Sequence, residues 1–272
     1  MQEQKRPLIC LHPDRTFMRR IREASADRFS VTRVKNWTHL RSALESAPPA
    51  AVVLVDPFYG TRSRVTPSED LHELLTAFPS STVLAAMETP ASHHHVFWKL
   101  GEWGISEIVQ VEDDSSDVAL RRRLRETRAQ PLRRLLASEQ IYRLTGRART
   151  ILDAAVETVM RGEHPRELAE TLDFSPSTLL RWCERSQLPT PRRLLLWMRI
   201  LFASTLLDDP GHSVSSVGKA CGYSGDQALR RAIRAILPYT PSELREMGAF
   251  DTVSEAFFAE LDRLHDPQAE KR

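Results

Sequence analysis

The side chains of this chain that could catalyse a reaction or bind a metal are few and scattered. The triplet His93–His95 suggests a metal site, but consecutive helical residues point about 100° apart, so the three imidazoles cannot all bind one ion. Three cysteines form no CxxC pair and lie in apolar surroundings, which predicts buried, unreactive thiols: Cys10, Cys183 and Cys221. No P-loop, GxSxG or HExxH motif occurs. We therefore expect no enzyme, no metal and no cofactor.

Arginines at helical spacing in the second half of the chain form a different kind of candidate. Residues 127–245 contain 18 Lys and Arg against 12 Asp and Glu, a net charge of +6, whereas the whole chain carries +2. An excess of positive charge in one block indicates an anionic partner. A solvated helical surface without any partner is the alternative.

The length of the chain predicts two domains that position these side chains. It has 272 residues, of which 41% are hydrophobic and 27% charged, as in ordinary globular proteins. The N-terminal residues lack the apolar run of a signal peptide, and no apolar stretch is long enough to span a membrane. We expect a cytoplasmic protein with no membrane partner.

The first half alternates short apolar runs with segments of helical periodicity. Such alternation with short connections predicts a parallel sheet covered by helices, an α/β doubly wound domain of flavodoxin type. Trp98 and Trp103 are expected to cover this sheet, with an aromatic ligand pocket as the alternative. The predicted strands are Leu8–Leu11, Phe29–Val34, Ala51–Val55, Val83–Met87 and Ile105–Val111, and the predicted helices are Asp14–Arg28, Trp37–Ser46, Ser68–Phe78, Ala91–Trp103 and Asp117–Thr127.

This layout resembles the receiver domain of bacterial response regulators. The run Val52–Val55 followed by Asp56 is similar to the third receiver strand, which ends in a phosphoacceptor aspartate. The resemblance implies that Asp56 is a possible degenerate phosphoacceptor. The positions of the receiver's hydroxyl and lysine fall near Met87 and Val111, which offer neither group.

The residues after the first predicted strand also depart from the receiver pattern. Receivers carry an acidic pair there that holds Mg²⁺, whereas this chain has His12 and Pro13, followed by Asp14 alone. A hard cation needs oxygen ligands, and a phosphoryl group needs a cation to neutralise it. We expect the domain to act without conventional phosphorylation. A weak ion held by Asp14 and Asp56, and with it a true phospho-responsive regulator, remains the alternative.

The second half contains an internal repeat at an offset of about 50 residues. Phe174 matches Tyr223, Arg181 matches Arg231, and the pair Thr190-Pro191 matches Thr240-Pro241. Self-similarity at a fixed offset indicates a duplicated structural unit. Each copy reads as a helix-turn-helix, with Asp173 and Gly222 as the turn residues and a long helix between the copies. The predicted helices are Pro165–Leu172, Pro176–Ser186, Pro191–Asp208, Val214–Cys221 and Gly225–Ala235.

This arrangement resembles the AraC/XylS-type DNA-binding domain over about residues 148–246. The segments that carry the resemblance are Leu168–Glu170 with Ser175–Arg181, Ala203–Leu207, Gly222–Ser224 and Tyr239–Arg245. Val217–Lys219 and Ile233-Arg234 depart from the usual residues of the second unit. The resemblance implies an all-α domain with two helix-turn-helix units joined by a long helix.

Two sets of side chains are expected to reach the DNA. Residues at i, i+3 and i+4 of a recognition helix face base edges, and Arg suits bidentate contact with guanine. A surface salt bridge with Glu184 or Glu170 is the alternative for Arg181. Asp226, which phosphate would repel, could instead cap its helix or accept a hydrogen bond from a cytosine amino group. The first set is Ser177, Leu180 and Arg181, and the second is Asp226, Gln227, Arg230 and Arg231.

The sequence thus predicts a sequence-specific DNA-binding transcriptional regulator, with double-stranded DNA and a second copy of the chain as partners. The first domain would dimerise or bind a protein or small-molecule effector. A scaffold whose helical half binds protein is the rival hypothesis. An amphipathic acidic tail follows, which docks on its own domain or contacts a partner. The expected divisions are 1–127 for the receiver-like domain, 128–147 for a helical linker, 148–248 for the DNA-binding domain and 249–272 for the tail.

Overall fold

The computed structural model describes two compact units of the chain. The described residues are 5–27, 29–49, 51–88, 94–105, 107–111 and 143–265, together with Leu132, Leu135, Leu136 and Ile141. The N-terminal unit comprises residues 1–128 with 209–211, and the C-terminal unit comprises the rest. The expected helix over Asp117–Thr127 and most of the expected linker lie outside the described residues.

The N-terminal unit contains a five-stranded parallel sheet. Its strand order is β2-β1-β3-β4-β5, in which the chain starts in the middle and winds outward in both directions. This is the flavodoxin-like doubly wound order, so the predicted fold class is confirmed. The strands are β1 (Arg6–Leu11), β2 (Phe29–Arg33), β3 (Val52–Val55), β4 (Thr82–Met87) and β5 (Glu107–Gln110).

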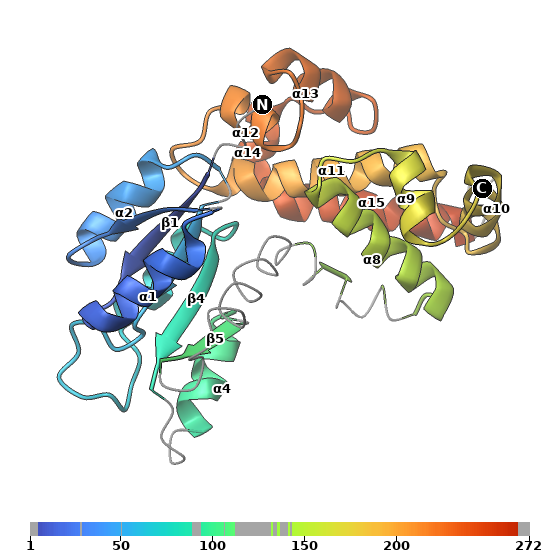
Figure 1. Ribbon diagram of the computed structural model, residues 1–272. Coiled ribbons are helices and arrows are strands. Elements are labelled where there is room, and N and C mark those ends of the chain that lie inside the picture. Colours follow the sequence, from blue (N-terminus) through green and yellow to red (C-terminus); the bar gives the residue numbers. More distant parts are fainter. Residues whose placement is uncertain are drawn as a thin grey trace. The chain divides into compact units, whose positions relative to one another are not determined.

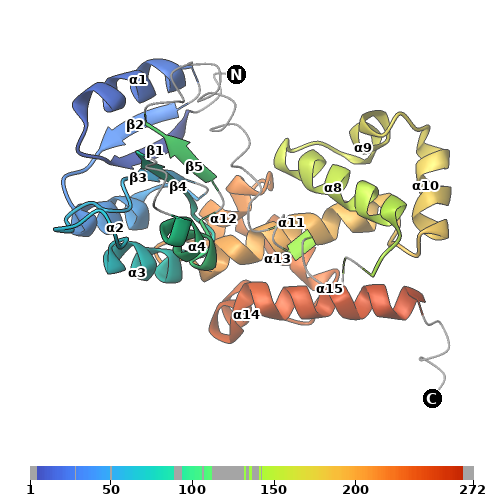
Figure 2. The same cartoon turned by 90° about the horizontal axis from the view of Figure 1, so that it is seen from below.

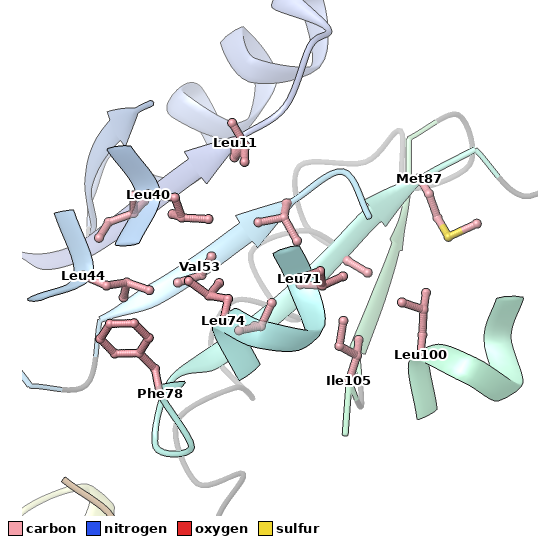
Figure 3. Packing of buried hydrophobic residues seen from close by; sticks show 14 of the residues in the cluster. Leu11, Leu40, Leu44, Val53, Leu71, Leu74, Phe78, Met87, Leu100 and Ile105 are labelled. Atoms are coloured by element: carbon pink, nitrogen blue, oxygen red, sulfur yellow. The ribbon is translucent and has the colours of Figure 1, made fainter. Parts of the chain in front are cut away.

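Successive residues of the strands pack into two separate hydrophobic layers. Val53 and Val55 face one layer and Val52 and Leu54 face the other, as the two-residue period of a strand requires. Helices α2, α3 and α4 cover the first layer (Figure 3) and α1 the second (Figure 2). These helices are α1 (Arg15–Ser25), α2 (Trp37–Ser46), α3 (Glu69–Ala77) and α4 (His94–Glu102).

The C-terminal unit is helical. Its long central helix α11 contacts α8–α10 on one side of the repeat and α12–α14 on the other (Figure 1). The all-α prediction for this half is confirmed, and the predicted helices agree with the observed ones to within one residue at each end. The helices are α8 (Gly146–Met160), α9 (Pro165–Thr171), α10 (Pro176–Arg185), α11 (Pro191–Asp208), α12 (Val214–Ala220), α13 (Asp226–Arg234), α14 (Pro241–Met247) and α15 (Ala249–His265).

The amphipathic tail packs against its own unit. Helix α15 runs alongside α11 (Figure 2), and Phe257, which is fully buried, lies against Trp197 with 5.6 Å between ring centres. Glu260 accepts hydrogen bonds from Arg193 at the start of α11. The backbone N–H groups that begin α15 are bound by Asp208 at the end of α11. Of the two alternatives for the tail, the structure therefore supports docking on its own domain.

Several single-residue expectations meet different outcomes. All three cysteines are buried, and burial raises the pKa of Cys10 and Cys221 to about 12 and that of Cys183 to about 11, so the thiols stay protonated.

Trp103 packs against the sheet, but the prediction for Trp98 is wrong, because its side chain is 82% exposed. It lies on the outer side of α4, whose inner side is occupied by buried Val96 and Leu100. No helix in the described ranges is long and apolar enough to cross a membrane.

Candidate nucleic-acid interface

The first helix-turn-helix unit consists of α9, a tight turn and α10. Asp173 adopts a left-handed conformation with φ of 55°, which closes the turn and lets the Phe174 N–H donate to the Ala169 carbonyl at 2.8 Å. Ser175 then caps α10, because its hydroxyl accepts the Thr178 N–H at 3.2 Å, and Pro176 occupies the first helical turn. The predicted turn at Asp173 is confirmed.

The second unit, α12 and α13, repeats this geometry with different residues. Gly222 takes the left-handed conformation at φ of 81°, and the Tyr223 N–H donates to the Gly218 carbonyl at 2.9 Å. A Cβ atom at Gly218 would lie 2.9 Å from the carbonyl oxygen of Gly225. The second copy therefore brings two backbone segments together where the first copy has room for the methyl group of Ala169.

Helix α10 presents the first predicted set of residues to solvent. Ser177 and Arg181 are exposed and Leu180 is 38% exposed, whereas Leu179 and Cys183 on the opposite side are buried. Among the described residues Arg181 pairs with neither Glu184 nor Glu170, and Glu170 instead pairs with Arg166 at 3.0 Å. Arg181 makes no salt bridge within the described part of the chain. Its guanidinium is thus available to an external acceptor.

Helix α13 presents only part of the second predicted set. Gln227 and Arg231 are exposed, but Asp226 and Arg230 are partly buried and form an ion pair at 3.7 Å. Gly225 occupies the N-cap position, so the alternative that Asp226 caps the helix is wrong. The residues that face outward at i, i+4 and i+7 are Gln227, Arg231 and Arg234.

The offset of 50 residues pairs the outward faces of the two helices position by position. Ser177 corresponds to Gln227, Arg181 to Arg231, and exposed Glu184 to exposed Arg234. The site residues proposed from sequence omitted Glu184 and Arg234, which the same helical spacing could have found. The common feature of the two faces is a single arginine at the centre, Arg181 in α10 and Arg231 in α13.

The Asp56 region of the N-terminal unit already contains its own cation. One oxygen of buried Asp56 accepts the Phe58 N–H at 3.0 Å, and the other accepts the Arg64 guanidinium at 3.2 Å. Arg64 also lies over the Phe58 ring, 5.5 Å from its centre. The positive charge beside Asp56 therefore comes from the Arg64 side chain, and the surroundings are not shaped to hold a hard metal ion.

The two remaining polar residues of this region are His12, which has no carboxylate, and Asp14, whose carboxylate is already hydrogen-bonded. Oδ1 of Asp14 accepts the Thr16 and Phe17 N–H groups as the cap of α1. His12 is buried against Phe17, and burial lowers its imidazole pKa, although Asp56 and Asp14 oppose that effect. Met87 is fully buried and Val111 packs against the sheet. These residues do not fit the oxygen-rich shell that Mg²⁺ requires.

The histidine triplet lies only partly within the described residues. His93 is outside them, whereas the His95 ring is hydrogen-bonded to the Val65 carbonyl at 2.9 Å. Among the residues that the structure describes, no group of three or more His, Cys, Asp or Glu side chains could hold a metal ion.

Comparison with known solved structures gives distant similarities. The chain is similar to the structure of xylose-binding transcription activator xylR, with 15% identity over 91% of this chain and 71% of that one, at a TM-score of 0.37. Full-length FixJ from B. japonicum gives 14% identity over 85% and 97%, with a TM-score of 0.37. A structure of two RcsB dimers bound to two parallel DNAs gives 16% over 86% and 100%, at 0.35. TM-scores this low do not establish a common arrangement of whole chains.

Comparison with sequences identifies the C-terminal unit. Among curated proteins, none matches the chain. The sequence model of one family, described as "Helix-turn-helix domain", matches residues 168–247, a range that begins in α9 and ends with α14 and so spans both copies of the repeat. Residues 168–247 therefore form a helix-turn-helix DNA-binding domain of the AraC/XylS type.

Proposed function

We propose that this chain is a sequence-specific transcription regulator whose helices α10 and α13 read two successive segments of the major groove. One observation carries the proposal: two copies of a helix-turn-helix, joined by one helix, each expose an arginine at the same position, Arg181 and Arg231, and neither arginine has a salt bridge among the described residues. A guanidinium so placed can make bidentate contact with O6 and N7 of guanine. Gln227, one turn before Arg231, suits adenine in the same way.

The surroundings of these arginines support recognition of DNA over recognition of protein. Each recognition helix buries only two of its own side chains and turns mainly polar or charged residues outward. Helix α11, which contacts α9, α10, α12 and α13, gives the two copies a common support. Two reading elements on a rigid connection favour two base determinants at a fixed spacing, one helical turn of DNA apart.

Binding of the full-length chain to duplex DNA over a range of salt concentrations tests this function. Because phosphate contacts release counterions, the logarithm of the binding constant should fall steeply and linearly with the logarithm of salt concentration. A flat response, or no duplex binding at low salt, would contradict the proposal and favour the protein-binding scaffold.

We further propose that the N-terminal unit regulates the chain without phosphorylation of Asp56. The support is the Arg64 guanidinium, which occupies the oxygen that a metal or a phosphoryl donor would need, and the use of Asp14 as a helix cap. The unit would then act through contacts with a second copy of the chain or with a protein or small-molecule effector. Exposed Trp98, with Phe97 and Glu102 beside it, lines an open pocket available for such contacts.

Exposure of the protein to acetyl phosphate and Mg²⁺ tests this second proposal. Intact mass should show no stoichiometric adduct, and duplex affinity should be unchanged. An adduct that disappears in Asp56→Asn and alters DNA binding would overturn it. The Arg64→Ala variant sharpens the test: if the guanidinium is what blocks the site, that variant should accept the phosphoryl group more readily than the wild type.

A further inference from the structure

An arginine outside both helix-turn-helix units lies against the first recognition helix. The guanidinium carbon of Arg147, at the second residue of α8, is 3.4 Å from the centre of the Trp182 ring on α10. The guanidinium carbon of Arg185, also on α10, is 5.4 Å from the same centre. Phe174 stacks on this indole at 6.3 Å between ring centres, with 24° between the ring planes. Trp182 thus gathers two cations beside α10.

Among the residues that the structure describes, these two cations have no carboxylate partner. Neither Arg147 nor Arg185 forms a salt bridge within the described residues, and both side chains are exposed. Arg161, the C-cap at the far end of α8, differs in this respect, because it pairs with Glu157 at 3.2 Å. A cation–π contact at an exposed site restrains the guanidinium and leaves its N–H donors available to an anion. An ordered guanidinium loses less entropy when an anion binds it.

The stack on Trp182 lies beside the face of α10 that is proposed to read base edges. Trp182 follows Arg181 directly, so its side chain is turned about 100° around the helix axis. Arg185 is one turn beyond Arg181, between that face and the indole. Groups beside a helix inserted in the major groove meet the sugar–phosphate backbone that borders the groove, and such contacts position the protein without reading sequence.

We propose that Arg147 and Arg185, held on Trp182, bind phosphate oxygens of duplex DNA beside the groove segment that α10 enters. This inference rests on the proposed DNA binding and extends the interface of the first unit to α8. It assigns to Trp182 a positioning role, in which the ring orients two cations that themselves touch the DNA.

Salt-dependent binding of full-length variants to a chosen duplex and to an unrelated duplex tests this inference. Arg147→Gln and Arg185→Gln should each weaken binding to both duplexes by the same factor and lower the slope of log affinity against log salt by about 1. Trp182→Leu should weaken both duplexes as well. Arg161→Gln is the matched control, since it removes an arginine of α8 that already has a carboxylate partner, and its slope should equal that of the wild type.

The outcomes separate this inference from the function on which it rests. If the wild type binds with a steep salt slope and both Arg147→Gln and Arg185→Gln keep that slope, the phosphate contact is wrong and DNA binding stands. A loss confined to one duplex would also overturn it, because a phosphate contact does not depend on sequence. If the wild type binds no duplex, the function itself fails. Should Arg147→Gln lower the melting temperature, Arg185→Gln, on the exposed side of α10, decides the question.

Discussion

Helices α10 and α13 occupy matching places in two copies of one unit, yet they present different chemistry to solvent. The outward face of α10 carries Ser177, Arg181 and Glu184, whereas that of α13 carries Gln227, Arg231 and Arg234. Inward, both helices use apolar residues at matching positions, with Leu179 and Leu229 fully buried. The two copies therefore share the residue types that the turn and the buried core require, and they differ at the exposed positions that would contact DNA.

The supports of the two copies differ as well. The first copy contacts α8 through the guanidinium of Arg147, which lies over the Trp182 ring. The second copy is followed by α14, from which Arg245 donates hydrogen bonds to the carbonyls of Leu207 and His212, at and just beyond the end of α11. The outward face of α13 carries two arginines, whereas that of α10 carries one arginine and one carboxylate. Apart from the phosphate contacts proposed for Arg147 and Arg185, we therefore expect the outward face of α13 to contribute more to salt-dependent affinity and that of α10 more to discrimination between sequences.

The largest effect that breaks this comparison is expected from the central arginines. Arg181→Ala and Arg231→Ala should each relax base preference at one position and cost on the order of 1–3 kcal/mol of discrimination. The measurement is affinity for duplexes that vary at each position in turn, with Arg161→Ala as a control. Equal weakening on every duplex would show contacts to phosphate alone. An effect of Arg181 without one of Arg231 would make the second copy a structural element.

An effect on stability rather than on recognition is expected from the close approach of Gly218 to the Gly225 carbonyl in the second copy. Gly218→Ala places a methyl group against the Gly225 carbonyl and should lower the free energy of unfolding by on the order of 1–3 kcal/mol. The matched change in the first copy, Ala169→Gly, should cost only about 0.5–1 kcal/mol through helix propensity. Urea unfolding of the two variants measures both values. A Gly218→Ala variant as stable as the wild type would show that the second turn has room to spare.

The smallest effect concerns acid and the helix starts. Hydrogen bonds from backbone N–H groups hold the pKa of Glu167 at α9, and of Glu243 at α14, below the usual value. The matching position at α12 is Ser216, which has no carboxylate; its N–H donates to the hydroxyl of Ser213 at 3.1 Å. A carboxylate whose pKa is lowered by folding stabilises above its unfolded pKa, and that contribution is lost as pH falls through the folded pKa. Glu167→Gln and Glu243→Gln should therefore flatten the decline of melting temperature on the acid side. Ser216→Ala should leave that decline as steep as in the wild type.

Local sequence patterns predicted the helices and strands of both units, because the periods of strands and helices and the residues of turns depend on neighbouring positions in the sequence. The alternation around Val52–Val55 and the turn residues Asp173 and Gly222 are examples. Contacts between distant residues were not predictable in this way. Arg64 pairs with Asp56 across a loop, Arg147 meets Trp182 from another helix, and Trp98 points outward because Val96 and Leu100 take the inner side of α4. Each depends on how elements pack, which spacing alone does not record.

Selection of binding sites from random duplexes by the full-length protein shows whether α10 and α13 each read a base. We expect an enriched site with two determinants about one helical turn apart, of which one is lost on selection with Arg181→Ala and the other with Arg231→Ala. Duplexes recovered without any common sequence, under conditions in which the protein remains folded, would contradict it.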